Sequence, residues 1–95
     1  MTKNIGITDL NKSIRRDYPT VWRFKYNGVP TEVVEGYFNN ESKIQTLHII
    51  MQTENGRYFV EVYVDSELLT TNEREVLELA AKRCKIAYKK QINGT

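Results

Sequence analysis

The sequence predicts an α+β fold in two layers: a helix, a four-stranded antiparallel β-meander and a second helix, with both helices on one face of the sheet. Three observations lead to this prediction. Runs of alternating apolar and polar residues are separated by Asn-Gly turn signals. The last quarter of the chain has an apolar stripe at helical spacing. One face of the predicted sheet is strongly apolar, so the helices have a surface to cover.

Length and composition indicate one domain, over residues 1–95, that needs no disulfide bond, metal or cofactor to fold. A chain of this size buries roughly 65% of the surface that its unfolded form exposes. Cys84 is the single cysteine, so no disulfide can form within the chain. We find no apolar run near the roughly 18 residues of a membrane span, and no signal-peptide pattern. The sequence therefore predicts a cytoplasmic protein without a membrane partner.

The first predicted element is a short amphipathic helix that begins near Thr8-Asp9 and ends before Pro19. Its apolar residues fall at helical spacing, and basic residues occupy the opposite side. The apolar positions are Ile7, Leu10, Ile14 and Tyr18, and the basic ones are Lys12, Arg15 and Arg16.

Two hairpins form the predicted meander. Residues 21–26 and 29–38 are joined at Asn27-Gly28 by a loop of two or four residues, and either length places Arg23 opposite Glu32. Residues 44–65 form the central hairpin around Asn55-Gly56, because a type I′ turn needs positive φ at both loop residues. With Asn55-Gly56 as the loop, one face is almost purely aliphatic. Its predicted pairs are Met51 with Val60, Ile49 with Val62 and Leu47 with Val64.

The other face of the predicted sheet, turned away from both helices, carries more apolar area than a face exposed only to water usually shows. A predicted pairing of Phe38 with Ile44 places Phe38 on this face. The candidates for a protein-binding surface there are Phe38, His48, Ile50, Phe59 and Tyr63.

The last predicted helix starts at Thr70-Thr71-Asn72-Glu73, which fits a capping box, and residues 91–95 are expected to fray. Residues 69–81 resemble the opening helix of the LuxR-type helix-turn-helix. The Gly-containing turn and recognition helix of that family do not follow, because residues 82–90 continue the same helical pattern. The resemblance therefore assigns no DNA-binding residue.

Charge is unevenly distributed, with net values of +4 for residues 1–26, −7 for residues 27–78 and +5 for residues 79–95. Such asymmetry is found in nucleic-acid-binding proteins, and also where helix termini and a solvated sheet face are simply charged. The basic candidates for nucleic-acid binding are Lys12, Arg15, Arg16, Lys82, Arg83, Lys85, Lys89 and Lys90.

No catalytic, metal-binding or phosphate-binding motif is evident, so we expect a non-enzymatic protein. His48 lacks a nucleophile partner, and Cys84 lies on the apolar stripe of the last helix, although Arg83 and Lys85 could lower its pKa. The favoured hypothesis is a protein-interaction module, an inhibitor or adaptor, that binds a partner or itself as a homodimer through the open sheet face. The alternative is a nucleic-acid-binding protein that uses the basic residues and sheet aromatics. A short domain rich in Lys, Asn and Ile also resembles bacteriophage proteins that act on a host factor.

Overall fold

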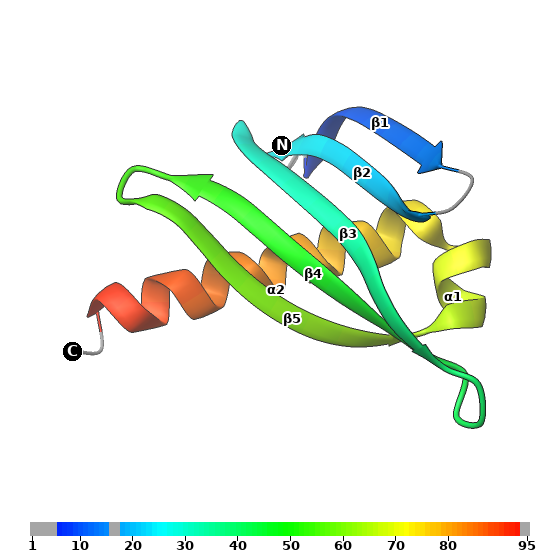
Figure 1. Ribbon diagram of the computed structural model, residues 1–95. Helices are drawn as coiled ribbons and strands as arrows, with labels where there is room; N and C mark the ends of the chain where they lie inside the picture. The colour runs from blue at the N-terminus through cyan, green and yellow to red at the C-terminus, as the bar shows by residue number, and fades with distance from the viewer. Residues whose placement is uncertain (1–5, 16–17, 94–95) are drawn as a thin grey trace.

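The computed structural model describes residues 6–15 and 18–93, which form an antiparallel sheet of five strands and two helices (Figure 1). The strands lie in the sheet in chain order: β1 (Ile7–Arg15), β2 (Tyr18–Tyr26), β3 (Val29–Asn39), β4 (Ile44–Thr53) and β5 (Gly56–Asp65). Helices α1 (Ser66–Thr71) and α2 (Glu73–Asn93) follow. The α+β class and the antiparallel meander are confirmed, whereas the prediction of four strands with a helix at each end of the chain is wrong.

The first segment is a strand and not the predicted helix. β1 pairs antiparallel with β2, starting from Ile7 opposite Tyr26. The register shifts after Thr8, where Asp9 has a φ of 58°. A β-bulge of this kind adds one residue to the strand, so the next residue that packs on the core after Ile7 is Leu10. Because of the bulge, Ile7 and Leu10, which both face the core, are three positions apart instead of two. In the sequence this spacing resembles the apolar stripe of a helix.

The first hairpin loop agrees with the sequence prediction. Asn27 and Gly28 have φ values of 51° and 85°, and Tyr26 pairs with Val29 across them. Two positive φ values in a two-residue loop are the requirement of a type I′ turn, whose twist suits the flanking strands.

The central hairpin differs from its prediction by two residues of register. Thr53 pairs with Gly56, so the loop is Glu54-Asn55 and Met51 lies opposite Tyr58. The Thr53 hydroxyl closes this loop, because it donates to the Gly56 carbonyl at 2.6 Å and accepts from the Asn55 N–H at 3.1 Å. A shift of two residues leaves every side chain on its predicted face, since strand side chains alternate with period two.

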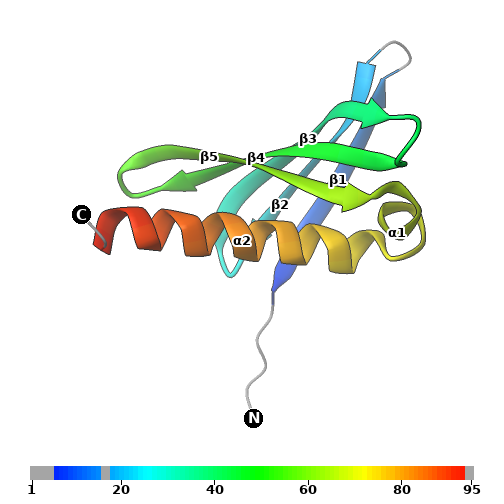
Figure 2. The same ribbon diagram turned by 90° about the horizontal axis from the view of Figure 1, so that it is seen from below.

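Helix α2 runs beneath one face of the sheet, whereas α1 lies at its end (Figure 2). The apolar core fills the space between α2 and the strands. Its side chains from the sheet include Trp22, Phe24, Val33, Leu47, Ile49 and Met51, and those from α2 are Val76, Leu77, Ala80, Ala81 and Cys84. α2 includes residues 91–93, where the sequence predicts a frayed tail, and residues 94–95 lie outside the described part.

The predicted capping box is not formed. α1 intervenes, with Asp65 as its N-cap, and the hydroxyls of Thr70 and Thr71 donate to carbonyls within α1. One residue, Asn72, separates α1 from α2. Its carbonyl accepts the first helical bond of α2, from the Val76 N–H at 3.0 Å.

Glu73, which the capping box would use locally, instead joins α2 to the sheet. Its carboxylate accepts a hydrogen bond from Trp22 Nε1 at 3.0 Å and lies 2.7 Å from Lys12 Nζ. The bond to Lys12 has the largest effect on the pKa of Glu73 and lowers it. Burial opposes this by a smaller amount, and the bond from Trp22 lowers the pKa further. The first turn of α2 is thereby fixed under β1 and β2.

Candidate protein-interaction surface

The sheet face turned away from α2, here called the open face, carries aromatic and apolar side chains in contact with solvent. Ile50 lies directly opposite Phe59, and the neighbouring pair is His48 with Glu61. Phe59 and Tyr63 are 56% and 64% exposed. Four of the five predicted protein-binding residues thus come together, and we call His48, Ile50, Phe59 and Tyr63 the open-face cluster.

The imidazole of His48 is held by three neighbours. It stacks on Phe59, with ring centroids 5.6 Å apart and an interplanar angle of 17°. Its Nδ1 lies 3.8 Å from a carboxylate oxygen of Glu61. Beneath the ring is Gly36, where an added Cβ would overlap the imidazole. The absence of a side chain at Gly36 therefore gives His48 its place on the open face.

Tyr63 is oriented by the same carboxylate. Its hydroxyl donates a hydrogen bond to Glu61 Oε1 at 3.1 Å. This bond, together with the negative charge of Glu61, raises the pKa of Tyr63 above its ordinary value, because only the neutral phenol can donate the hydrogen bond and the phenolate would be repelled. Glu61 thus contacts both a ring nitrogen and a phenol, and it links two members of the cluster.

Phe38 does not join this cluster. The β3–β4 register shifts between Glu35 and Phe38, so Phe38 lies opposite Gln45 instead of the predicted Ile44. Gln45 shares its face with Leu47, which is fully buried under α2, and directly opposed residues share a face. The bulge at residues 36–37 therefore moves Phe38 to the helix side of the sheet, and the sequence contains no signal for that bulge other than Gly36.

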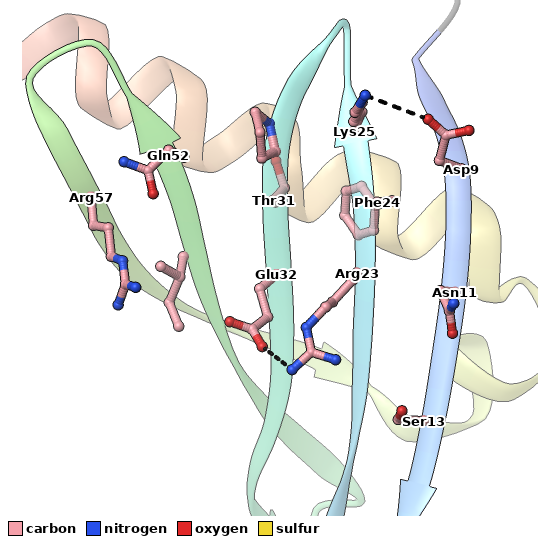
Figure 3. A pocket seen from close by; sticks show the side chains of 12 residues that line it. Asp9, Asn11, Ser13, Arg23, Phe24, Lys25, Thr31, Glu32, Gln52 and Arg57 are labelled. Carbon is pink, nitrogen blue, oxygen red and sulfur yellow. Dashed lines mark ion pairs between the residues drawn. The ribbon is translucent and has the colours of Figure 1, made fainter.

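A polar hollow of about 570 Å³ lies beside the cluster on the same face (Figure 3). Two ion pairs cross it: Arg23 to Glu32 at 3.0 Å, a pairing the sequence predicts, and Lys25 to Asp9 at 3.9 Å. Its other polar lining side chains include Asn11, Ser13, Gln52 and Arg57. The sequence does not predict this hollow, because β1, which supplies one wall, is interpreted there as a helix.

The basic candidates that the structure describes do not gather on one surface. Lys12 is paired with Glu73 under the first strands, and the Nζ of Lys85, near the other end of α2, lies 5.9 Å from the centre of the Tyr26 ring. Lys82, Arg83, Lys89 and Lys90 are exposed along α2. Arg16 and the side chain of Arg15 lie outside the described part of the structure.

Cys84 is fully buried, and this burial raises its pKa to about 11. Arg83 and Lys85 therefore do not activate it as the sequence suggested they could. At neutral pH the side chain is a protonated thiol that packs as a small apolar group.

Over residues 6–15 and 18–93, no group of three or more His, Cys, Asp and Glu side chains is placed to hold a metal ion. The helices in that part are too short or too polar to cross a membrane. The chain matches no protein-family model, no curated protein and no solved structure.

Proposed function

We propose that this chain is a small non-enzymatic protein-interaction module, an inhibitor or adaptor, that binds a protein partner through the open-face cluster. The observation that carries the proposal is the exposure of Phe59 and Tyr63, at 56% and 64%, on a sheet face that no described segment covers. Aromatic residues of this kind supply a large share of the free energy of protein association. An exposed apolar patch with a polar border is also typical of interaction sites.

The order within the cluster supports the same proposal. His48 is stacked on Phe59, and Tyr63 is hydrogen-bonded to Glu61 before any partner arrives. Side chains that are already fixed lose less conformational entropy when they bind. The cluster is therefore better suited to recognition than freely rotating surface aromatics would be.

The test is the double substitution Phe59→Ser with Tyr63→Ser. Both side chains point to solvent, so the domain should stay folded by circular dichroism, while partner binding weakens by about 2 kcal/mol or more, roughly 30-fold. Affinity capture from a nuclease-treated bacterial lysate identifies the partner, and bacterial extract is chosen because the sequence resembles bacteriophage proteins that act on a host factor. The matched control is Ile86→Ser with Ile92→Ser, two exposed residues of α2. Equal binding by wild type and the Phe59/Tyr63 variant would contradict the proposal.

Nucleic-acid binding is the second candidate, supported by the exposed Lys82, Arg83, Lys89 and Lys90 on α2. On the open face Arg23 and Lys25 are already paired with carboxylates, and Glu61 beside the cluster would repel a phosphate backbone. If this candidate is right, changing the four α2 residues to Gln should abolish RNA or DNA binding and flatten its dependence on salt, because each phosphate contact releases counterions. Under the protein-binding proposal the same variant keeps its partner.

A further inference from the structure

The free edge of β5 presents a regular row of backbone hydrogen-bonding groups. The Ser66 N–H donates to the Lys43 carbonyl, on the chain just before β4, at 3.0 Å, and direction alternates along an antiparallel strand. Even-numbered residues of β5 therefore face β4. Residues 57, 59, 61, 63 and 65 direct their N–H and C=O groups away from it, and β5 is the last strand of the described sheet (Figure 1).

We propose that a second copy of this chain pairs antiparallel with β5, about a two-fold axis at Glu61. The inference rests on the proposed function and names a partner for it, because Phe59 and Tyr63 belong to both surfaces. In this register each Arg57 lies opposite the partner's Asp65, and each Phe59 opposite the partner's Tyr63. The strand thus meets its own copy with two pairs of opposite charges and two aromatic pairs, which are favourable across strands.

Other registers are less complementary. Outward groups must meet outward groups, so only slips of two residues are allowed. A slip in one direction places Arg57 opposite Tyr63 and Phe59 opposite Glu61, and so loses both kinds of pair. A slip in the other direction places Phe59 opposite Asp65 and extends the pairing into α1, which begins at Ser66.

The helix side of the same edge is also apolar. A groove of about 270 Å³ lies between β5 and α2, lined by Val62, Val64, Leu68, Leu79 and Arg83 among others. Leu68 and Leu79 are 53% and 60% exposed. α2 lies on one side of the sheet (Figure 2). A two-fold axis perpendicular to the sheet keeps both α2 helices on that side, so in the proposed dimer the groove beside Val62 and Val64 faces residues 60 and 58 of the second copy instead of solvent.

Cross-linking tests the register. In the proposed dimer the two copies of residue 61 form a hydrogen-bonded pair with Cα atoms about 5.5 Å apart, within the range of a disulfide. The two copies of residue 57 lie roughly 27 Å apart along the strands. Glu61→Cys should form a covalent dimer on mild oxidation, and Arg57→Cys should not. The buried Cys84 takes no part. Equal cross-linking of both variants, or a wild type that sediments as a monomer up to high micromolar concentration, would overturn the inference.

Two further variants separate the edge from the open face. Glu61→Gln removes the repulsion between two like charges at the axis and should tighten the dimer up to about fivefold. Glu61→Pro removes an outward N–H and should weaken it about tenfold or more while the fold is retained, and Glu61→Ala, which keeps that N–H, is its control. A dimer that survives Glu61→Pro but is lost with Phe59→Ser and Tyr63→Ser assembles face to face. That result refutes the edge pairing and upholds the proposed function, as does a monomer that captures a different protein.

Discussion

The two edges of the sheet are built differently, although both strands are about equally long. β1 changes register twice along its nine residues, and Asp9 in the first shift has a φ of 58°. β5 pairs with β4 at all ten of its residues without a shift. Bulges hinder a sheet edge from pairing with another chain. The difference fits the proposed dimer, with the β1 edge closed to pairing and the β5 edge open.

The edges also differ in how α2 holds them. Arg74 of α2 donates a hydrogen bond to the Ile7 carbonyl of β1, and Glu73 joins Lys12 and Trp22. β5 contacts α2 through apolar groups. Among them, the rings of Tyr58 and Tyr88 pack edge to face with their centroids 5.4 Å apart. One carbonyl and one charged side chain of β1 are thus bonded to α2, whereas β5 packs on α2 through apolar side chains.

The largest expected effect distinguishes the two sides of β5. Val62→Pro removes an N–H that faces β4 and disturbs a residue that is only 6% exposed, so the free energy of unfolding should fall by about 3 kcal/mol or more. Glu61→Pro, one residue away, should cost far less because its N–H faces outward. Thermal denaturation of both variants measures this, and equal losses would show that the assigned direction of the β5 backbone is wrong.

The next effect concerns the closed edge. Glu73→Ala leaves the buried Trp22 without its acceptor, which should reduce the free energy of unfolding by about 1–3 kcal/mol. Amide hydrogen exchange should accelerate in β1 and β2 and stay unchanged in β5. Glu73→Gln, which keeps an acceptor for Trp22, is the matched control and should be milder. Uniform acceleration over all strands would mean that Glu73 stabilises the whole domain instead of one edge.

The attachment of α2 to the sheet through Glu73 weakens in acid. The folded pKa of Glu73 lies below its ordinary value of 4.5, so its stabilising contribution is fully present above that pH. It is lost as the pH falls below 4.5 through the folded pKa, because the folded state resists protonation. Glu73→Gln should remove this part of the acid dependence, and urea denaturation at several acidic pH values compares the two chains. Parallel pH profiles would contradict the assignment.

The smallest effect lies where β5 begins. Gly56 has a φ of 111°, so Gly56→Ala should cost about 1 kcal/mol or slightly more. Asn55→Ala should cost only a few tenths, since its exposed bond to the Tyr88 hydroxyl at 2.9 Å is what it loses. Denaturation midpoints give both values. A larger loss of stability with Asn55→Ala than with Gly56→Ala would favour the Asn55-Gly56 loop that the sequence predicts.

Most of the sheet follows from sequence, because alternation and turn signals act locally. The pairing of Arg23 with Glu32 and the loop at Asn27-Gly28 are both present as predicted. The central register differs from the prediction because the Thr53 hydroxyl closes the loop one position before Asn55-Gly56. Since that error is an even number of residues, the faces and most of the candidate cluster were still predictable.

Bulges account for the larger errors. One extra residue at Asp9 in β1 gives Ile7 and Leu10 a helical spacing, and one at residues 36–37 moves Phe38 to the helix side. Both depend on how the strands pair, so no local pattern other than Gly36 indicates them. The β5 edge, by contrast, follows from the predicted meander itself, in which the second strand of the central hairpin is already the last strand of the sheet.

Cys84 gives the chain a natural reporter of opening. Its sulfur is buried between α2 and the sheet, and it is almost wholly protonated at neutral pH because its pKa is about 11. A thiol reagent can therefore reach it only after α2 lifts from the sheet, and the labelling rate at increasing reagent concentration measures the frequency of that motion. Comparing this rate in the presence and absence of a partner would reveal whether binding on the sheet restrains the helix behind it.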